Sequence, residues 1–197
     1  FNNREFNKRG RKLRDCVYNS DSLPYVEHIY GDTLYDYAGS LVTDGGCART
    51  DVYVKKEVDI TNWYEGQPSP QITSMTQREY DRYRNVERYT HYGDITHTDE
   101  YFRAEIEYAQ NMPHNMVSLP VRIEVYDIDD TLLQMRTADY NPNNGRMTTL
   151  RLHNYSDTAR YDFGHDSYGN MSDATMPANA NGQRLTMKYQ YDNTVHT

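Results

Sequence analysis

The chain has 197 residues and a formal net charge of −8, and Leu, Ile, Val and Phe together account for only 32 of those residues. This aliphatic content is lower than a globular core normally needs, and taken alone it favours disorder. The 20 tyrosines argue against disorder, because a tyrosine buries a large ring while its hydroxyl stays hydrogen-bonded or wet. No apolar stretch approaches the roughly 18 residues of a membrane helix, which excludes a transmembrane helix.

A short motif recurs along the chain: an aromatic residue, then Asp or Asn, two variable residues and Gly. Full or imperfect copies lie at 6–11, 35–40, 80–85, 140–146 and 165–170, another begins at 191, and a degenerate copy lies at 126–131. The copy at 80–85 has Arg84 in the glycine position, and the copy at 140–146 is one residue longer. Because the spacing is irregular, the pattern indicates repeats with insertions rather than a strict solenoid.

This motif predicts the tip of a β-hairpin. An Asp or Asn at the first turn position can accept a hydrogen bond from the backbone two residues on. A glycine three residues later can take the left-handed conformation that closes a three-residue hairpin loop. At 80–85, either Arg84 adopts that conformation at a cost of about 1 kcal/mol or Asn85 adopts it instead. The residues that we assign to the turn motif are Tyr35, Asp36, Gly39, Tyr80, Asp81, Asn85, Tyr140, Gly145, Asp166, Gly169, Asn170, Tyr191 and Asp192.

The segments between the motifs alternate as strands do. Apolar and polar residues alternate over 102–108, 121–126 and 185–191, and 52–54 and 86–92 are rich in strand-forming residues. A helix over 99–110 is the alternative for that segment, but the strict alternation favours a strand. The segments 63–70 and 176–182 are predicted to be irregular loops. No linker divides the chain, so we expect one all-β segment over 1–197.

The sequence resembles the Rhs, or YD-repeat, family of bacterial polymorphic toxins. The resemblance rests on Tyr35-Asp36-x-x-Gly39, Tyr80-Asp81, Asp166-x-x-Gly169-Asn170 and Tyr189-x-Tyr191-Asp192. It implies consecutive antiparallel hairpins in a curved open sheet that forms part of a larger hollow shell. It also implies that the chain is a fragment of a longer protein, since no core terminator or toxin domain follows the repeats.

The same resemblance implies a structural function. The segment would help a secreted or cell-surface bacterial shell to enclose and deliver a C-terminal toxic effector. Its partners would be neighbouring repeats and the effector, and we expect no catalysis by this segment, no cofactor and no metal. The alternative is a carbohydrate-binding or adhesive cell-surface β-module, in which tyrosines would stack on glycans. A fragment of a glycan-active enzyme is a third option, but it needs a cleft with paired carboxylates.

Three other clusters could carry chemistry. His91 and His97 lie among acidic residues, but six residues of strand separate them by about 20 Å, so a polar loop is favoured over a metal site. Glu105 and Glu107 alternate onto the same face as Arg103, which predicts a cross-strand row of ion pairs rather than an acid–base pair. Residues 1–14 hold six basic residues and one acid, yet the acidic remainder argues against a nucleic-acid partner.

Overall fold

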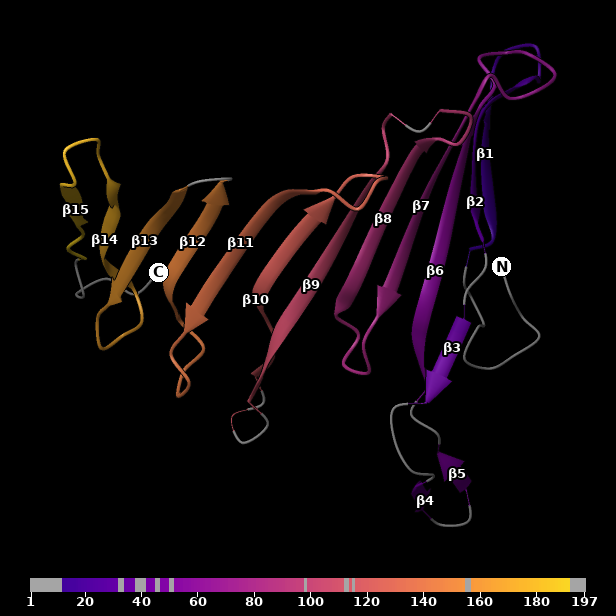
Figure 1. The fold of residues 1–197 in the computed structure, drawn as a ribbon. Helices are drawn as coiled ribbons and strands as arrows, with labels where there is room; N and C mark the ends of the chain where they lie inside the picture. The colour runs from indigo at the N-terminus through magenta and orange to yellow at the C-terminus, as the bar shows by residue number, and fades with distance from the viewer. Residues whose placement is uncertain are drawn as a thin grey trace. The chain divides into compact units, whose positions relative to one another are not determined.

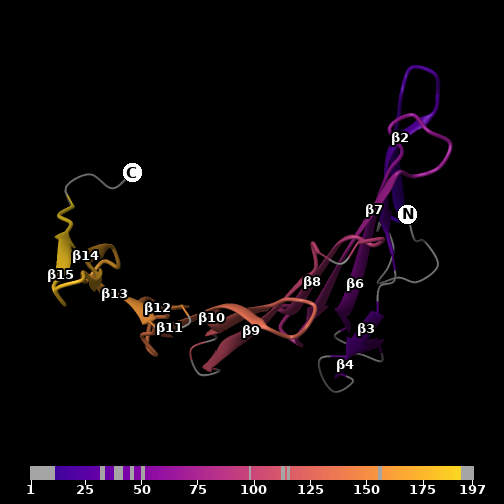
Figure 2. The same cartoon turned by 45° about the horizontal axis from the view of Figure 1, so that its top comes forward.

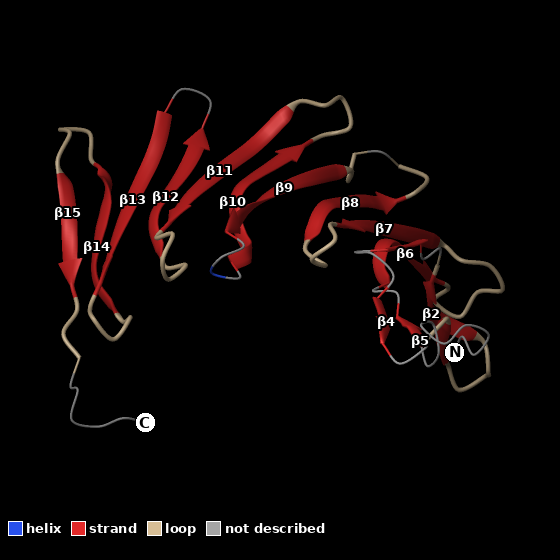
Figure 3. Cartoon of the chain, turned by 90° about the horizontal axis from the view of Figure 1, so that it is seen from below, coloured by secondary structure: helices blue, strands red, loops and turns tan. Residues whose placement is uncertain are grey.

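The computed structural model describes residues 12–31, 34–37, 42–44, 47–49, 52–97, 99–111, 114, 116–154 and 157–191. These residues form strands joined by turns, and Figure 3 shows strands throughout this part of the chain. The all-β expectation is therefore confirmed. No helix in these ranges has the length and hydropathy to cross a bilayer.

The strands follow one another with short connections, as Figure 1 shows. Their bounds are β1 Arg14–Tyr18, β2 Pro24–Tyr30, β3 Leu34–Tyr37, β4 Val42–Asp44, β5 Cys47–Arg49, β6 Val52–Trp63, β7 Ile72–Tyr80, β8 Val86–Asp94, β9 Phe102–Asn111, β10 Met116–Tyr126, β11 Leu132–Tyr140, β12 Met147–Asn154, β13 Asp157–His165, β14 Met171–Ala178 and β15 Arg184–Lys188.

The strand order is almost that of the sequence. Thirteen strands form one sheet, and from β6 to β15 each strand lies beside the next strand of the chain. Figure 1 shows β6, β7 and β8 side by side in this order, and Figure 2 shows the same strands in a tilted view. The exception is an insertion: β2 pairs with β6, β3 also pairs with β6, and β4 pairs with β5 in a separate ribbon. The described sheet is open, with β1 at one end and β15 at the other, which confirms the expected series of consecutive antiparallel hairpins.

The chain divides into two compact units. One comprises residues 1–105 with 126–131, and the other comprises 106–125 with 132–197. In the first unit, β7 pairs with β6 and β8 through long antiparallel ladders. In the second unit, β11 to β15 form a continuous series of antiparallel pairs.

Few side chains of the described residues are buried. The buried hydrophobic residues among them are Ala138 and Ala174, and none of their large side chains is fully buried. The buried polar residues are Glu27, Asn85, Thr90 and Thr149. The low aliphatic content of the sequence thus corresponds to a thin sheet that is stabilised by hydrogen bonds and by partly covered rings.

Two of the sequence predictions for local structure can be decided here. The segment 102–108 is a strand, β9, as expected from its alternation. The expected irregular loop over 176–182 is wrong, because β14 continues to Ala178 and a short turn over 179–183 joins it to β15.

Candidate functional site

The hairpin tip at 165–170 shows how the repeated motif folds. The Asp166 carboxylate oxygen Oδ1 accepts hydrogen bonds from the backbone N–H groups of Tyr168 at 2.9 Å, Gly169 at 2.7 Å and Asn170 at 2.9 Å. Asn170 Nδ2 donates to the other oxygen at 3.1 Å. Gly169 has φ 99, the left-handed conformation that the motif requires. Burial raises the pKa of Asp166, but these hydrogen bonds outweigh it and hold the pKa below its usual value.

The tip at 80–85 has the same geometry with a different residue in the left-handed position. Asp81 Oδ1 accepts from the N–H groups of Tyr83 at 2.8 Å and Asn85 at 2.9 Å, and Asn85 Nδ2 donates to Oδ2 at 2.9 Å. The left-handed residue is Arg84, with φ 69, so the alternative assignment to Asn85 is wrong. The physical reason is that the Asn85 side chain is buried against Asp81 and caps the turn.

Four further tips use the same arrangement. Their first residues are Asn19, Asp127, Asn141 and Asn179, each of which accepts a hydrogen bond from the N–H two residues on. Their left-handed residues are Ser22, Asp130, Gly145 and Gly182. Gly145 lies four residues after Asn141 instead of three, which accounts for the longer motif copy at 140–146.

Two of the tyrosines that stand directly before a tip bond to the preceding strand. Tyr80, at the end of β7, donates from its hydroxyl to Glu57 Oε2 on β6 at 2.7 Å. Tyr140, at the end of β11, donates to the carbonyl oxygen of Pro120 on β10 at 3.0 Å. Burial and the bond to Glu57 raise the pKa of Tyr80 to about 12. Tyr80 and Tyr140 therefore tie the hairpins that they begin to the preceding strand.

Glycine also allows neighbouring tips to approach closely. A Cβ on Gly169 would lie 2.1 Å from Arg146 Nη2, which belongs to the tip of the β11–β12 hairpin. A Cβ on Gly145 would lie 3.0 Å from the Met116 sulfur and 3.3 Å from Leu119. In this second unit, two of the left-handed glycines therefore serve as contact points as well as turn residues.

Replacing Gly169 by alanine is expected to destabilise the second unit by about 1–2 kcal/mol, because the left-handed conformation opposes a Cβ and the Arg146 guanidinium must move aside. The measurement is a urea titration followed by circular dichroism. The double variant Gly169→Ala/Arg146→Ala isolates the contact. If it is no more stable than the two single changes predict together, the close approach of Arg146 has no energetic weight.

The remaining residues that the sequence assigns to the turn motif do not lie in the hairpin tips described above. Tyr35 and Asp36 are inside β3, opposite Val54 and Tyr53, so Asp36 is a strand residue and not the first residue of a turn. Tyr191 is exposed beyond the end of β15. Gly39 and Asp192 lie outside the described residues, as does the motif copy at 6–11.

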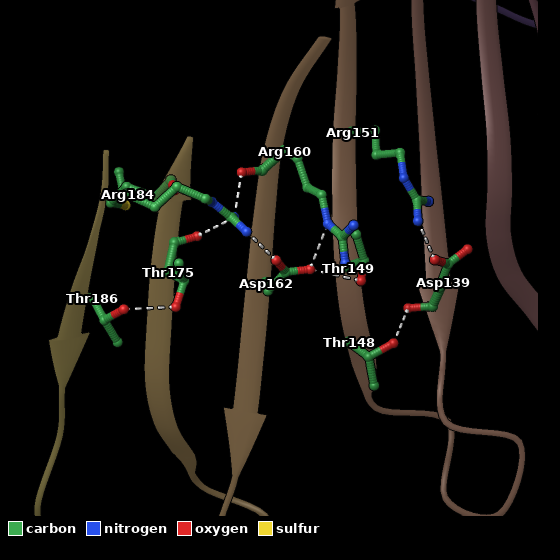
Figure 4. A network of polar contacts seen from close by, with 10 residues as sticks. Asp139, Thr148, Thr149, Arg151, Arg160, Asp162, Thr175, Arg184 and Thr186 are labelled. Atoms are coloured by element: carbon green, nitrogen blue, oxygen red, sulfur yellow. Dashed lines mark hydrogen bonds and ion pairs between the residues drawn. The ribbon is translucent and has the colours of Figure 1, made fainter. Parts of the chain in front are cut away.

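A polar network crosses β11 to β15 in the second unit, as Figure 4 shows. Its centre is Asp162 on β13, which accepts from Thr149 Oγ1 at 3.0 Å and Arg160 Nε at 2.9 Å on one oxygen and from Arg184 Nη1 at 2.6 Å on the other. Arg151 donates to Asp139 at 2.7 Å on the neighbouring strands. The contacts of Asp162 thus join β12, β13 and β15, and the Arg151–Asp139 pair adds a separate bridge between β11 and β12.

Arg184 donates hydrogen bonds to backbone carbonyl oxygens beside a register shift between β14 and β15. The register between β14 and β15 shifts between Thr175 and Ala178, where Pro177 has no N–H to donate. The Arg184 guanidinium donates to the backbone carbonyl oxygens of Met176 at 2.9 Å, Arg160 at 2.8 Å and Thr175 at 3.3 Å. This role of Arg184 is not among the predictions made from the sequence. The available indication was a proline inside an alternating segment followed by an arginine at the start of the next strand.

The Asp162 network makes the second unit sensitive to acid. Burial raises the pKa of Asp162, but hydrogen bonds from Arg184, Arg160 and Thr149 outweigh it and lower the pKa below its ordinary value of 3.8. A carboxylate with a lowered folded-state pKa stabilises fully above its unfolded pKa and loses that contribution as the pH falls through its folded pKa.

We therefore expect Asp162→Asn to lower the melting temperature at pH 6, and we expect the difference from the parent chain to shrink as the pH falls below 3.8. Melting curves at a series of pH values from neutral to strongly acidic measure this. A difference that is constant over the whole series would show that the Asp162 charge contributes nothing.

The first unit contains the expected cross-strand ion pairs. Arg88 on β8 bridges Glu79 on β7 at 3.1 Å and Glu105 on β9 at 3.5 Å. Arg103 contacts Glu105 at 3.2 Å and Asp130 at 2.7 Å. Hydrogen bonding to Asp130 raises the pKa of Arg103. Glu105 is therefore part of an ion-pair row, as the alternation predicted.

The histidine-rich segment forms a polar turn. Asp94 accepts from the Thr96 N–H at 3.0 Å and the Thr96 hydroxyl at 2.8 Å, and its second oxygen lies 3.2 Å from His97 Nδ1. These hydrogen bonds lower the pKa of Asp94. Across the ranges that the structure describes, no group of three or more His, Cys, Asp or Glu residues is placed to hold a metal ion.

Among known proteins, only solved structures show a similarity to this chain. No protein-family model and no curated protein matches the chain. Thirteen chains of solved structures are similar. One belongs to the crystal structure of TcdB2-TccC3-TEV, with 8% sequence identity and a TM-score of 0.27. The similarity covers 83% of this chain but only 11% of that chain.

Proposed function

We propose that the chain is a structural wall segment of an Rhs-type repeat shell, which encloses and helps to deliver a C-terminal effector from a bacterium. The observation that carries this proposal is the repeated hairpin with a tip capped by Asp or Asn. Six such tips connect strands of a thin sheet in which the described part of the chain fully buries no large side chain. Such a sheet spans area with few residues, which suits a wall.

The side-chain chemistry supports a structural role. The carboxylates of Asp81 and Asp166 cap turns, and that of Asp162 joins strands. A general acid or base needs a carboxyl that faces substrate, whereas these carboxyls face backbone amides and arginines. In this proposal the segment catalyses nothing, and its partners are neighbouring repeats of the same chain and the enclosed effector. The protein would be secreted or exposed at the cell surface.

Electron cryomicroscopy of the full-length gene product tests the proposal. We expect a closed shell whose wall contains this segment and whose interior holds a C-terminal domain that resists protease until the shell is opened. A full-length product without an enclosed volume, or with a C-terminal domain that protease removes at once, would overturn the proposal. A repeat-free product that binds a glycan array would instead favour the carbohydrate-binding alternative.

The 197-residue chain on its own is expected to self-associate. The edge strand β15 is exposed along its whole length, and it presents Leu185 at 72% and Met187 at 48% exposure. An unprotected edge of this kind is a template for another strand. Light scattering after size exclusion should show oligomers, and Leu185→Lys/Met187→Lys should shift them to monomer. A monodisperse, cooperatively melting monomer of the unchanged sequence would contradict the expectation.

A further inference from the structure

Two Asn-Gly dipeptides occur in the chain, at 144–145 and 181–182. In such a pair the backbone nitrogen of the glycine can attack the carbonyl carbon of the asparagine side chain, because glycine has no Cβ to obstruct the approach. Both dipeptides lie at hairpin tips that an earlier asparagine caps, and both glycines have a positive φ. One chain therefore places the same reactive pair in two different surroundings.

The tip at 179–183 leaves its Asn-Gly pair unprotected. Asn181 and Gly182 are exposed, and the Asn181 side chain has no hydrogen-bond partner among the described residues. A Cβ built on Gly182 would meet nothing within 4 Å. The tip joins β14 to β15, which lies at the end of the described sheet and pairs there with β14 alone. The Asn181 side chain can therefore turn toward the Gly182 nitrogen without displacing a neighbour.

The tip at 141–146 holds the other Asn-Gly pair in place. Asn144 Oδ1 accepts a hydrogen bond from the Arg146 N–H at 3.1 Å, which fixes the side-chain amide. Gly145 is half-buried, and a Cβ there would lie 3.0 Å from the Met116 sulfur. β12, which follows this tip, pairs with both β11 and β13. A reaction at Asn144 therefore requires a hydrogen bond to break and a packed tip to move.

The two tips share one further requirement for the reaction. The Gly182 N–H donates to the Asn179 carbonyl oxygen at 2.9 Å, and the Gly145 N–H donates to the Asn141 carbonyl oxygen at 2.8 Å. Each of these hydrogen bonds must open before the glycine nitrogen can attack. The reactivity of the two tips therefore differs through the side-chain hydrogen bond and the packing that only the tip at 141–146 has.

From this contrast we propose that Asn181 is a site of spontaneous deamidation in the folded chain and that Asn144 is protected. The Gly182 nitrogen loses its proton to hydroxide and forms a bond to Asn181 Cγ. The Cγ–Nδ2 bond breaks, and the side-chain nitrogen leaves as ammonia with a proton from water. Water then opens the cyclic imide at either carbonyl, which yields aspartate or isoaspartate. This modification does not depend on the proposed wall role.

Both products change the tip between β14 and β15. Each adds a carboxylate, and isoaspartate also routes the backbone through the former side chain, which lengthens the loop by one methylene group. Asn179 Oδ1 accepts hydrogen bonds from the N–H groups of Asn181 at 2.9 Å and Gln183 at 3.0 Å, and this cap depends on the normal spacing of the backbone. We therefore expect isoaspartate to weaken the cap and the attachment of β15.

Peptide mapping by mass spectrometry tests the proposal on the 197-residue chain. The chain is aged in mildly alkaline buffer, which favours loss of the amide proton, and conversion at both asparagines is followed with time. We expect Asn181 to convert at least about fivefold faster than Asn144, because the Asn144 side chain must first lose its hydrogen bond. In denaturing urea the two rates should converge. The same ratio in buffer and in urea, or faster conversion at Asn144, would overturn the proposal.

Variants assign the product to the exposed tip. An isoaspartyl methyltransferase transfers a methyl group to isoaspartate, so the enzyme labels the peptide that contains residue 181 after digestion of the aged chain. Asn181→Gln should abolish this label, because glutamine would have to close a larger ring. Asn144→Gln, the matched control, should leave the label unchanged. An undiminished label in Asn181→Gln, or its loss in Asn144→Gln, would contradict the assignment.

Discussion

Alanine at Gly93 is expected to destabilise the first unit by about 2–4 kcal/mol, the largest effect of any single glycine substitution in the described chain. Gly93 is buried near the end of β8 and has φ 59, where a side chain is strained. A Cβ there would also lie 2.4 Å from the Cβ of Glu100, an atom fixed to its own backbone that cannot swing aside. Both penalties therefore apply at once.

The matched control is Gly182→Ala. Gly182 has φ 75, but a Cβ there meets nothing within 4 Å, so only the conformational cost of about 1 kcal/mol remains. Urea titrations followed by circular dichroism give both free energies of unfolding. If Gly93→Ala costs no more than Gly182→Ala, the close approach of Glu100 is not present in solution.

The second large effect is expected at Glu27, whose side chain is the most buried carboxylate in the described residues at 3% exposure. Asn62 Nδ2 and the Tyr64 hydroxyl both donate to Oε2 at 3.0 Å, and Arg14 forms an ion pair with Oε1. Burial raises the pKa of Glu27, but these donors outweigh it and lower the pKa. The carboxylate thus joins β1, β2 and the end of β6.

Glu27→Ala should cost about 2–4 kcal/mol, because it leaves the half-buried Asn62 amide and Tyr64 hydroxyl without their acceptor. Glu87→Ala, an exposed change on β8, serves as the control and should stay within about 0.5 kcal/mol of the parent. Thermal and urea unfolding measure both. Equal stability of the two variants would show that the Glu27 cluster does not hold the first strands together.

Short sequence patterns predict the individual strands and hairpin tips of this fold. Alternation with period two locates β9, and the tip at 165–170 contains every residue type that its turn needs. The tips at 19–23 and 179–183 were not recognised from the sequence as copies of the motif. At 179–183 the capping Asn179 follows Ala178 instead of an aromatic residue, whereas at 19–23 Tyr18 does precede the capping Asn19 but Ser22 replaces the glycine in the left-handed position. The Asp or Asn cap, rather than glycine, is the common element.

Long-range features left no such local pattern. The pairing of β2 with β6 closes over an inserted segment, and nothing in the sequence of either strand specifies that partner. The role of Arg184 depends on a bulge that Pro177 creates in the neighbouring strand. The exposed apolar row of Val17, Val26, Trp63 and Ile72 depends on the register of four strands, β1, β2, β6 and β7. Each of these features arises from which strands become neighbours, and single-strand patterns do not determine that.

The sequential strand order from β6 to β15 has a consequence for how the chain acquires its structure. Each strand from β7 to β15 pairs with the strand that precedes it in the sequence, so its contacts are local and close only short loops. A new hairpin can therefore add to the finished ones as soon as the ribosome releases it, without waiting for the distant end of the chain. If the strands fold in this order during translation, only the most recently folded strand has an unpaired edge. The next strand to be synthesised then pairs with that edge.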